Sequence, residues 1–82
     1  MKIKNNPLVS IVLITYNSQK YVLDTLESVK SQTWENIELI ISDDGSKDST
    51  VEICDRWLKE NQHRFYNSRL ITVKENTGIP AN

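Results

Sequence analysis

Two apolar runs, each followed directly by a cluster of polar side chains, restrict the fold of this chain more than any other feature. The first run covers residues 9–14 and is followed by Thr-Tyr-Asn at 15–17. The second covers residues 37–41 and is followed by Ser-Asp-Asp-Gly-Ser at 42–46. Uninterrupted runs rich in β-branched residues are typical of parallel strands that are covered on both faces. Because parallel strands bring their carboxyl ends to one edge, where α/β sheets bind ligands, the sequence predicts that both clusters line one crevice.

A helical pattern lies between the two runs, and another follows the second run. Residues 18–33 place apolar side chains on one stripe, and Asn17 or Ser18 is the predicted N-cap. Ser49 and Glu52 have the spacing of a capping box, which predicts a second helix from this point. The predicted buried stripes are Val22, Leu26, Val29 and Thr33 in the first helix, and Val51, Cys54 and Leu58 in the second.

The remaining segments complete an alternation of strands and helices. Residues 61–68 are polar and predict a loop, residues 70–73 predict a third strand, and residues 76–78 predict a turn. The predicted order is β-α-β-α-β with right-handed crossovers, which makes an α/β half-sheet of the nucleotide-binding type. Because the sequence stops where the next helix should begin, we interpret residues 1–82 as a fragment of a longer protein.

The composition argues against several classes of protein. The net charge is −1 and no basic patch stands out, so no nucleic-acid partner is predicted. The longest apolar run is far shorter than the roughly 20 residues that span a membrane. The single cysteine, Cys54, can form no internal disulfide, which fits a reducing compartment. We therefore expect a soluble, cytoplasmic protein, and leave open whether the intact protein lies at the inner face of the membrane.

The polar clusters have the chemistry of a nucleotide site. Consecutive residues of a strand point to opposite faces, so one of Asp43 and Asp44 should face the crevice and the other the loop or the second helix. A carboxylate in the crevice can accept a hydrogen bond from a base N–H, and Tyr16 offers a flat face for stacking. Gly45 and Ser46 are small and allow the backbone to approach a ligand closely.

Simpler interpretations stay open. The segment 43–46 is also typical of a turn followed by a helix cap. Tyr16 could be an aromatic residue packed at the rim, and Asn17 could act only as a cap. His63 has no second metal-type ligand at suitable spacing and is interpreted as a surface histidine. The chain has neither a Gly-x-Gly-x-x-Gly nor a Walker A pattern after either strand, which argues against dinucleotide and P-loop sites.

The stretch VSIVLITYNSQKYVLDTLESVKSQTWENIELIISDDGSKDST, residues 9–50, resembles the N-terminus of family 2 glycosyltransferases. The shared features are the strand that ends in TYN, the following Tyr21, the SVKSQTW segment, the spacing to IELIISDDGS, and the later ENTGIPAN. The resemblance implies an inverting enzyme of the GT-A fold that uses nucleotide-diphosphate sugars. It implies that residues 1–82 are the N-terminal part of a three-layer α/β/α, Rossmann-like domain with mostly parallel strands.

The resemblance also implies roles for individual residues. Thr15 and Tyr16 fall where the family contacts the nucleobase and ribose, and Asp44 falls where a carboxylate receives the base N–H. The residues implied to bind the nucleotide-sugar are Thr15, Tyr16, Asn17, Asp43, Asp44, Gly45 and Ser46. The family holds a divalent metal, Mn or Mg, with a downstream Asp-x-Asp motif and uses a later carboxylate as general base. These 82 residues contain no Asp-x-Asp, so neither a metal ligand nor a catalytic residue is predicted here, and the fragment alone is expected to be inactive.

The sequence therefore predicts part of an enzyme that moves a sugar from a nucleotide-diphosphate sugar, preferably a UDP-sugar, to a hydroxyl of a sugar or glycolipid acceptor. Such a reaction belongs to polysaccharide or glycoconjugate biosynthesis. One alternative is a non-catalytic nucleotide-binding or oligomerisation module with the same half-sheet. A phospho-receiver-like module would need an acceptor Asp after the third strand, where residues 73–76 supply none. A half-sheet also leaves an unpaired edge and an apolar face, so self-association is expected.

Overall fold

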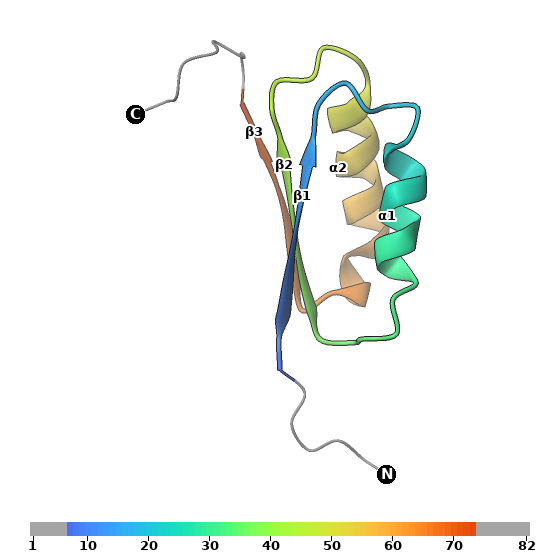
Figure 1. Cartoon of the computed structure of the whole chain (residues 1–82), viewed down its shortest axis with the longest axis vertical. Coiled ribbons are helices and arrows are strands. Elements are labelled where there is room, and N and C mark those ends of the chain that lie inside the picture. The colour runs from blue at the N-terminus through green and yellow to red at the C-terminus, as the bar shows by residue number, and fades with distance from the viewer. Residues whose placement is uncertain (1–6, 74–82) are drawn as a thin grey trace.

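The structure, a computed structural model, describes residues 7–73, in which two helices pack on one face of a parallel sheet (Figure 1). The sheet has three strands in the order β1-β2-β3, and both neighbouring pairs are parallel. This confirms the predicted α/β class and the β-α-β-α-β order. The elements are β1 (Val9–Thr15), α1 (Val22–Lys30), β2 (Ile37–Asp43), α2 (Thr50–Asn61), the 3₁₀ turn η1 (Gln62–Arg64) and β3 (Asn67–Thr72).

The three strands end level with one another at the carboxyl edge of the sheet. Thr15 pairs with Asp43, and Asp43 pairs with Thr72. The backbone bonding continues one residue further, since the Asp44 N–H donates to the Thr15 carbonyl at 2.9 Å. The loops that follow β1 and β2 therefore emerge side by side at the same end of the molecule (Figure 1).

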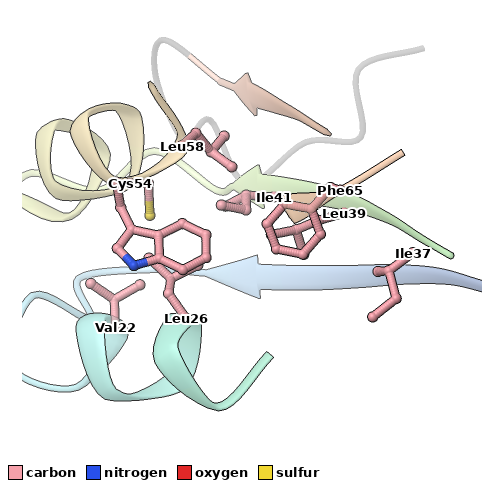
Figure 2. Close-up of a cluster of buried hydrophobic side chains, with 9 residues drawn as sticks. Val22, Leu26, Ile37, Leu39, Ile41, Cys54, Leu58 and Phe65 are labelled. Carbon is pink, nitrogen blue, oxygen red and sulfur yellow. The ribbon is translucent and has the colours of Figure 1, made fainter. Parts of the chain in front are cut away.

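The hydrophobic core lies between the sheet and the two helices, as Figure 2 shows. Alternate residues of β2 are buried, which is the period expected of a strand with one covered face. Cys54 is fully buried, as its place on the predicted stripe indicated, and burial together with the charge of Asp43 raises the pKa of its thiol to about 11. The core residues are Val22, Leu26, Ile37, Leu39, Ile41, Cys54, Trp57, Leu58 and Phe65.

The opposite face of the sheet is covered by no element among residues 7–73. Both helices lie on one side, so the described residues supply two of the three predicted layers, and the expectation that the first strand is covered on both faces is not met within them. Val12 and Ile14 on this face are 59% and 72% exposed, and Ile71 of β3 is 44% exposed. Self-association through this face stays a prediction.

The first helix is shorter than its sequence pattern indicates. Helix α1 begins after Tyr21, not after Asn17 or Ser18, and ends at Lys30. The predicted caps are wrong because Asn17 adopts a positive φ of 48° and its polar groups bond to the β2–α2 loop instead. Thr33 lies outside the helix and is exposed, so the buried stripe ends with the half-buried Val29.

The predicted loop at residues 61–68 is partly wrong. Helix α2 continues to Asn61, η1 follows it, and β3 already begins at Asn67. Polar residues start this strand because its outer face is exposed, and the Asn67 side chain donates to Glu38 at 3.3 Å. The predicted turn at 76–78 lies outside the described residues. No helix within residues 7–73 is long and apolar enough to cross a membrane.

The second helix begins where the sequence predicts, but its cap differs. Ser49 occupies the N-cap position and its side chain makes no capping hydrogen bond. The carboxylate of Asp48 accepts the Thr50 N–H at 2.9 Å instead. The capping box of Ser49 and Glu52 is therefore wrong, because the carboxylate one residue earlier satisfies a free N–H of the first turn.

Replacing Ser49 by alanine should consequently change the free energy of unfolding by less than about 0.5 kcal/mol, as for other surface substitutions. If Ser49 and Glu52 formed a capping box, the same substitution would lower the free energy of unfolding by about 1 kcal/mol. Urea denaturation followed by tryptophan fluorescence measures the difference. A loss of 1 kcal/mol or more would contradict the assignment of the cap to Asp48.

Candidate functional site

Asp43, at the end of β2, holds the loop that follows it. Its side chain is 1% exposed. Its Oδ1 accepts hydrogen bonds from the Thr15 and Ser46 hydroxyls, both at 2.6 Å. Its Oδ2 accepts the backbone N–H groups of Gly45 at 3.1 Å and Ser46 at 2.7 Å. One buried carboxylate thus closes the β2–α2 loop and ties it to β1.

These contacts keep Asp43 ionised. Burial raises the pKa of the carboxyl, but the hydrogen bonds from Ser46, Thr15 and Gly45 outweigh burial and lower the pKa below its ordinary value. Of the two acids, Asp43 is the one that faces the loop, as the alternation of strand residues predicted for one of them. Because both oxygens already accept two hydrogen bonds each, the geometry favours support of the loop as the role of Asp43.

The tight turn after Asp43 depends on Gly45. Its φ is 83°, in the left-handed region that residues with a Cβ enter at a cost. This conformation turns the chain so that the N–H of the next residue, Ser46, donates to the Asp43 carboxylate at 2.7 Å. The small size of Gly45 is therefore used to close the loop, independently of whether a ligand approaches it.

The β1–α1 loop lies against the β2–α2 loop and bonds to it. The Asn17 N–H donates to Ser46 Oγ at 2.7 Å, and Asn17 Oδ1 accepts the Lys47 N–H at 2.8 Å. Thr15 is 3% exposed, and its hydroxyl is used by Asp43. Three residues that were predicted to bind the nucleotide-sugar therefore place these polar atoms in hydrogen bonds that join the β1 and β2 ends to each other. They are Thr15, Asn17 and Ser46.

Three further residues of this junction were missed by the sequence analysis. Gln19 Oε1 accepts the Ser49 N–H at 2.7 Å, and the Gln19 N–H donates to Asp48 Oδ2 at 3.2 Å. The buried Thr50 hydroxyl accepts the Ser18 N–H at 2.7 Å. An Asp two residues before a Thr at a helix start is a recognisable capping signal, whereas nothing in the sequence marks Gln19.

Tyr16, Asn17 and Asp44 are the exposed members of the predicted site. Tyr16 and Asp44 each follow one member of the Thr15–Asp43 ladder pair, so these two residues occupy neighbouring positions at the edge of the sheet. Tyr16 is 46% exposed, and Asp44 is exposed. The structure thus brings all seven predicted residues to one edge and leaves an aromatic residue and an acidic residue exposed there.

The described residues do not fit a divalent metal. Within residues 7–73 there is no group of three His, Cys, Asp or Glu side chains that could hold one. Asp43 already accepts four hydrogen bonds within and beside the loop, and His63 lies exposed in η1, at the opposite end of the sheet from the β2–α2 loop (Figure 1).

The structure is an α/β half-sheet in which the polar residues that follow the first two strands lie together at one edge. The model of the family described as "Glycosyl transferase family 2" matches residues 10–82. The chain therefore belongs to glycosyl transferase family 2, as the TYN and SDDGS motifs indicated.

Curated relatives agree with this assignment. The chain is 43% identical to "Glycosyltransferase GlyG" of Streptococcus pneumoniae over 66% of this chain and 18% of the relative. It is 37% identical to "Putative glycosyltransferase EpsH" of Bacillus subtilis over 92% of this chain and 20% of the relative. It is 41% identical to "UDP-Glc:alpha-D-GlcNAc-diphosphoundecaprenol beta-1,3-glucosyltransferase WfaP" of Escherichia coli over 84% of this chain and 24% of the relative. The chain thus spans at most about a quarter of the length of these relatives.

Proposed function

We propose that this chain is the nucleotide-recognising part of a glycosyltransferase that transfers a sugar from a nucleotide-diphosphate sugar to a hydroxyl group, with inversion. The observation that carries the proposal is the pair of exposed residues, Tyr16 and Asp44, which directly follow the paired ends of β1 and β2, next to loops that the buried Asp43 anchors. Preorganised loops of this kind suit a ligand whose orientation must be reproduced before each transfer.

A uridine nucleotide suits the two exposed groups. The ring of Tyr16 can stack on the base, which is worth about 1–3 kcal/mol for any base. The carboxylate of Asp44 accepts hydrogen bonds only, so it favours a base with a ring N–H, as in uracil, over cytosine, which offers a ring acceptor there. The name of the E. coli relative specifies a UDP-Glc donor, which supports UDP as the first candidate.

The rest of the reaction is assigned to the intact protein. A divalent metal, Mn or Mg, and a general-base carboxylate are expected outside the residues described here. The acceptor would be the hydroxyl of a sugar or glycolipid, since the name of the E. coli relative describes a diphosphoundecaprenol-linked sugar. We place the reaction in the cytoplasm, at or near the inner face of the membrane, and expect no transfer by residues 1–82 alone.

The base preference tests the proposal. Asp44→Asn in the full-length protein should weaken UDP binding by about 1.5–3 kcal/mol, the range for a hydrogen bond to a charged group. Asparagine can turn either its oxygen to uracil or its N–H to cytosine, so the preference for UDP over CDP should also fall. Calorimetric titration of UDP and CDP measures both quantities.

Tyr16→Ala is the matched comparison, because it should weaken the binding of UDP and of CDP by similar amounts and leave the UDP-to-CDP affinity ratio unchanged. A ratio that stays the same in Asp44→Asn would show that this carboxylate does not read the base. Nucleotide binding by the full-length protein without any sugar transfer in the presence of Mn²⁺ or Mg²⁺ would favour the alternative of a non-catalytic binding module.

A further inference from the structure

The two loops that carry Tyr16 and Asp44 are joined by a set of hydrogen bonds, here called the inter-loop clamp, between residues 17–19 and 46–50. Three consecutive backbone N–H groups of the first loop donate to side chains of the second, and two side chains of the first loop accept N–H groups in return. The bonds are Asn17 N–H to Ser46 Oγ, Ser18 N–H to Thr50 Oγ1, Gln19 N–H to Asp48 Oδ2, Lys47 N–H to Asn17 Oδ1 and Ser49 N–H to Gln19 Oε1.

The two hydroxyls of the clamp that accept these N–H groups each donate a hydrogen bond to a carboxylate. Ser46 Oγ donates to Asp43 Oδ1 at 2.6 Å, and Thr50 Oγ1 donates to Asp48 Oδ1. Desolvation raises the pKa of Asp48, but the bonds from Thr50 and Gln19 outweigh it and keep the carboxyl ionised. Each chain of hydrogen bonds, from N–H to hydroxyl to carboxylate, therefore ends on a charged acceptor, which strengthens the bonds along the chain.

The clamp lies directly beside the two base-reading residues. Tyr16 precedes Asn17, and Asp44 is two residues before Ser46. The only side-chain contact of Gln19 to the second loop is the Ser49 N–H, and Gln19 is exposed. When this contact is lost, water can solvate the Ser49 N–H, so the folded state loses little. The four remaining bonds still join the loops, but the Ser49 end of the second loop is held less tightly.

We propose that Gln19 is a positioning residue of the nucleotide site, whose side chain acts through the Ser49 N–H to keep the β1–α1 and β2–α2 loops in fixed register. This inference rests on the proposed function, because it concerns how that site discriminates between bases. Its physical reason is that stacking on Tyr16 and bonding to Asp44 must be satisfied by one base at the same time. After a small shift between the loops, a base can still stack on Tyr16 or bond to Asp44, but one base can no longer do both at once.

The test uses the full-length protein with UDP and CDP as probes. Gln19→Leu removes the acceptor oxygen at nearly constant size, and Gln19→Glu retains an oxygen there. Gln32→Leu is the matched control, since it also removes one exposed hydrogen bond, to the Ser28 carbonyl at the far end of α1. Gln19→Leu should lower the UDP-to-CDP affinity ratio by about fivefold, the size of one ordinary hydrogen bond, with Gln19→Glu restoring most of it.

Thermal midpoints separate positioning from stability. Gln19→Leu and Gln32→Leu should have similar midpoints, while only Gln19→Leu changes the UDP-to-CDP ratio. If wild type binds UDP in preference to CDP and Gln19→Leu keeps that ratio, the inference is overturned and the proposed function stands. If wild type binds neither nucleotide, the proposed function is overturned and the inference with it.

Discussion

Asp43→Ala should lower the free energy of unfolding by about 3–5 kcal/mol, because it leaves several buried donors without an acceptor at about 1–3 kcal/mol each. The donors are the Thr15 hydroxyl and the backbone N–H groups of Gly45 and Ser46. Such a loss is comparable with the whole stability of a small domain. Urea denaturation of the chain measures it.

Asp43→Asn should cost less than Asp43→Ala. The amide oxygen can serve the two backbone N–H groups, and the Thr15 and Ser46 hydroxyls can rotate to accept from the amide N–H. Asp55→Ala is the surface control, because its side chain is 52% exposed and, within residues 7–73, forms an ion pair only with Lys59, at 3.0 Å in α2. Exposed pairs contribute about 0–1 kcal/mol, so an equal loss for Asp43→Ala and Asp55→Ala would contradict the anchoring role.

The same carboxylate gives the stability a pH dependence of known sign. The pKa of Asp43 is lower in the folded chain than its ordinary value, so the folded state favours the ionised form. Its contribution is therefore complete above the unfolded pKa of about 3.9 and is lost as pH falls through the lower folded pKa. The difference in stability between wild type and Asp43→Asn should accordingly narrow below about pH 4.

The architecture was predictable because its signals are local. Apolar runs at 9–14 and 37–41 mark the first two parallel strands, and polar residues directly after them mark the edge that carries the candidate site. The spacing of Val22 and Leu26, and of Cys54 and Leu58, marks which helix faces are buried. Each of these signals depends on a few neighbouring residues.

The roles of the individual residues in the site could not be predicted from the sequence, because they depend on contacts between distant segments. Asn17 is a good helix cap by residue type, yet it bonds to Ser46 and Lys47, about thirty positions away. Ser49 and Glu52 fit a capping box, but Asp48 is closer to the free N–H of Thr50. That Asp43 faces inward while Asp44 is exposed follows from the alternation of β2. The bond from Thr15 to Asp43 depends on the register of β1 against β2, which the sequence leaves undetermined.

Arg64 makes the comparable anchor at the opposite end of the sheet. Its Nε donates to the Lys30 carbonyl at 2.9 Å, and its Nη atoms donate to three carbonyls of the α1–β2 connection, those of Gln32, Trp34 and Glu35. The guanidinium also lies 5.5 Å from the centre of the Phe65 ring. The planar guanidinium of Arg64 therefore fixes the α1–β2 connection, which forms no helix or strand.

Arg64→Met keeps an apolar stem and removes every donor, so the free energy of unfolding should fall by about 3 kcal/mol, as expected when bonds from a charged group are lost. Arg64→Lys should recover less than half of this, because a single ammonium cannot reach four carbonyls at once. Urea denaturation measures both values. In the full-length protein under folding conditions, neither variant should change the UDP-to-CDP affinity ratio, because η1, which contains Arg64, lies at the end of the sheet away from the β1–α1 and β2–α2 loops (Figure 1). A changed ratio would mean that the two ends are coupled through β2, and that discrimination between bases depends on the whole sheet and not on its carboxyl edge alone.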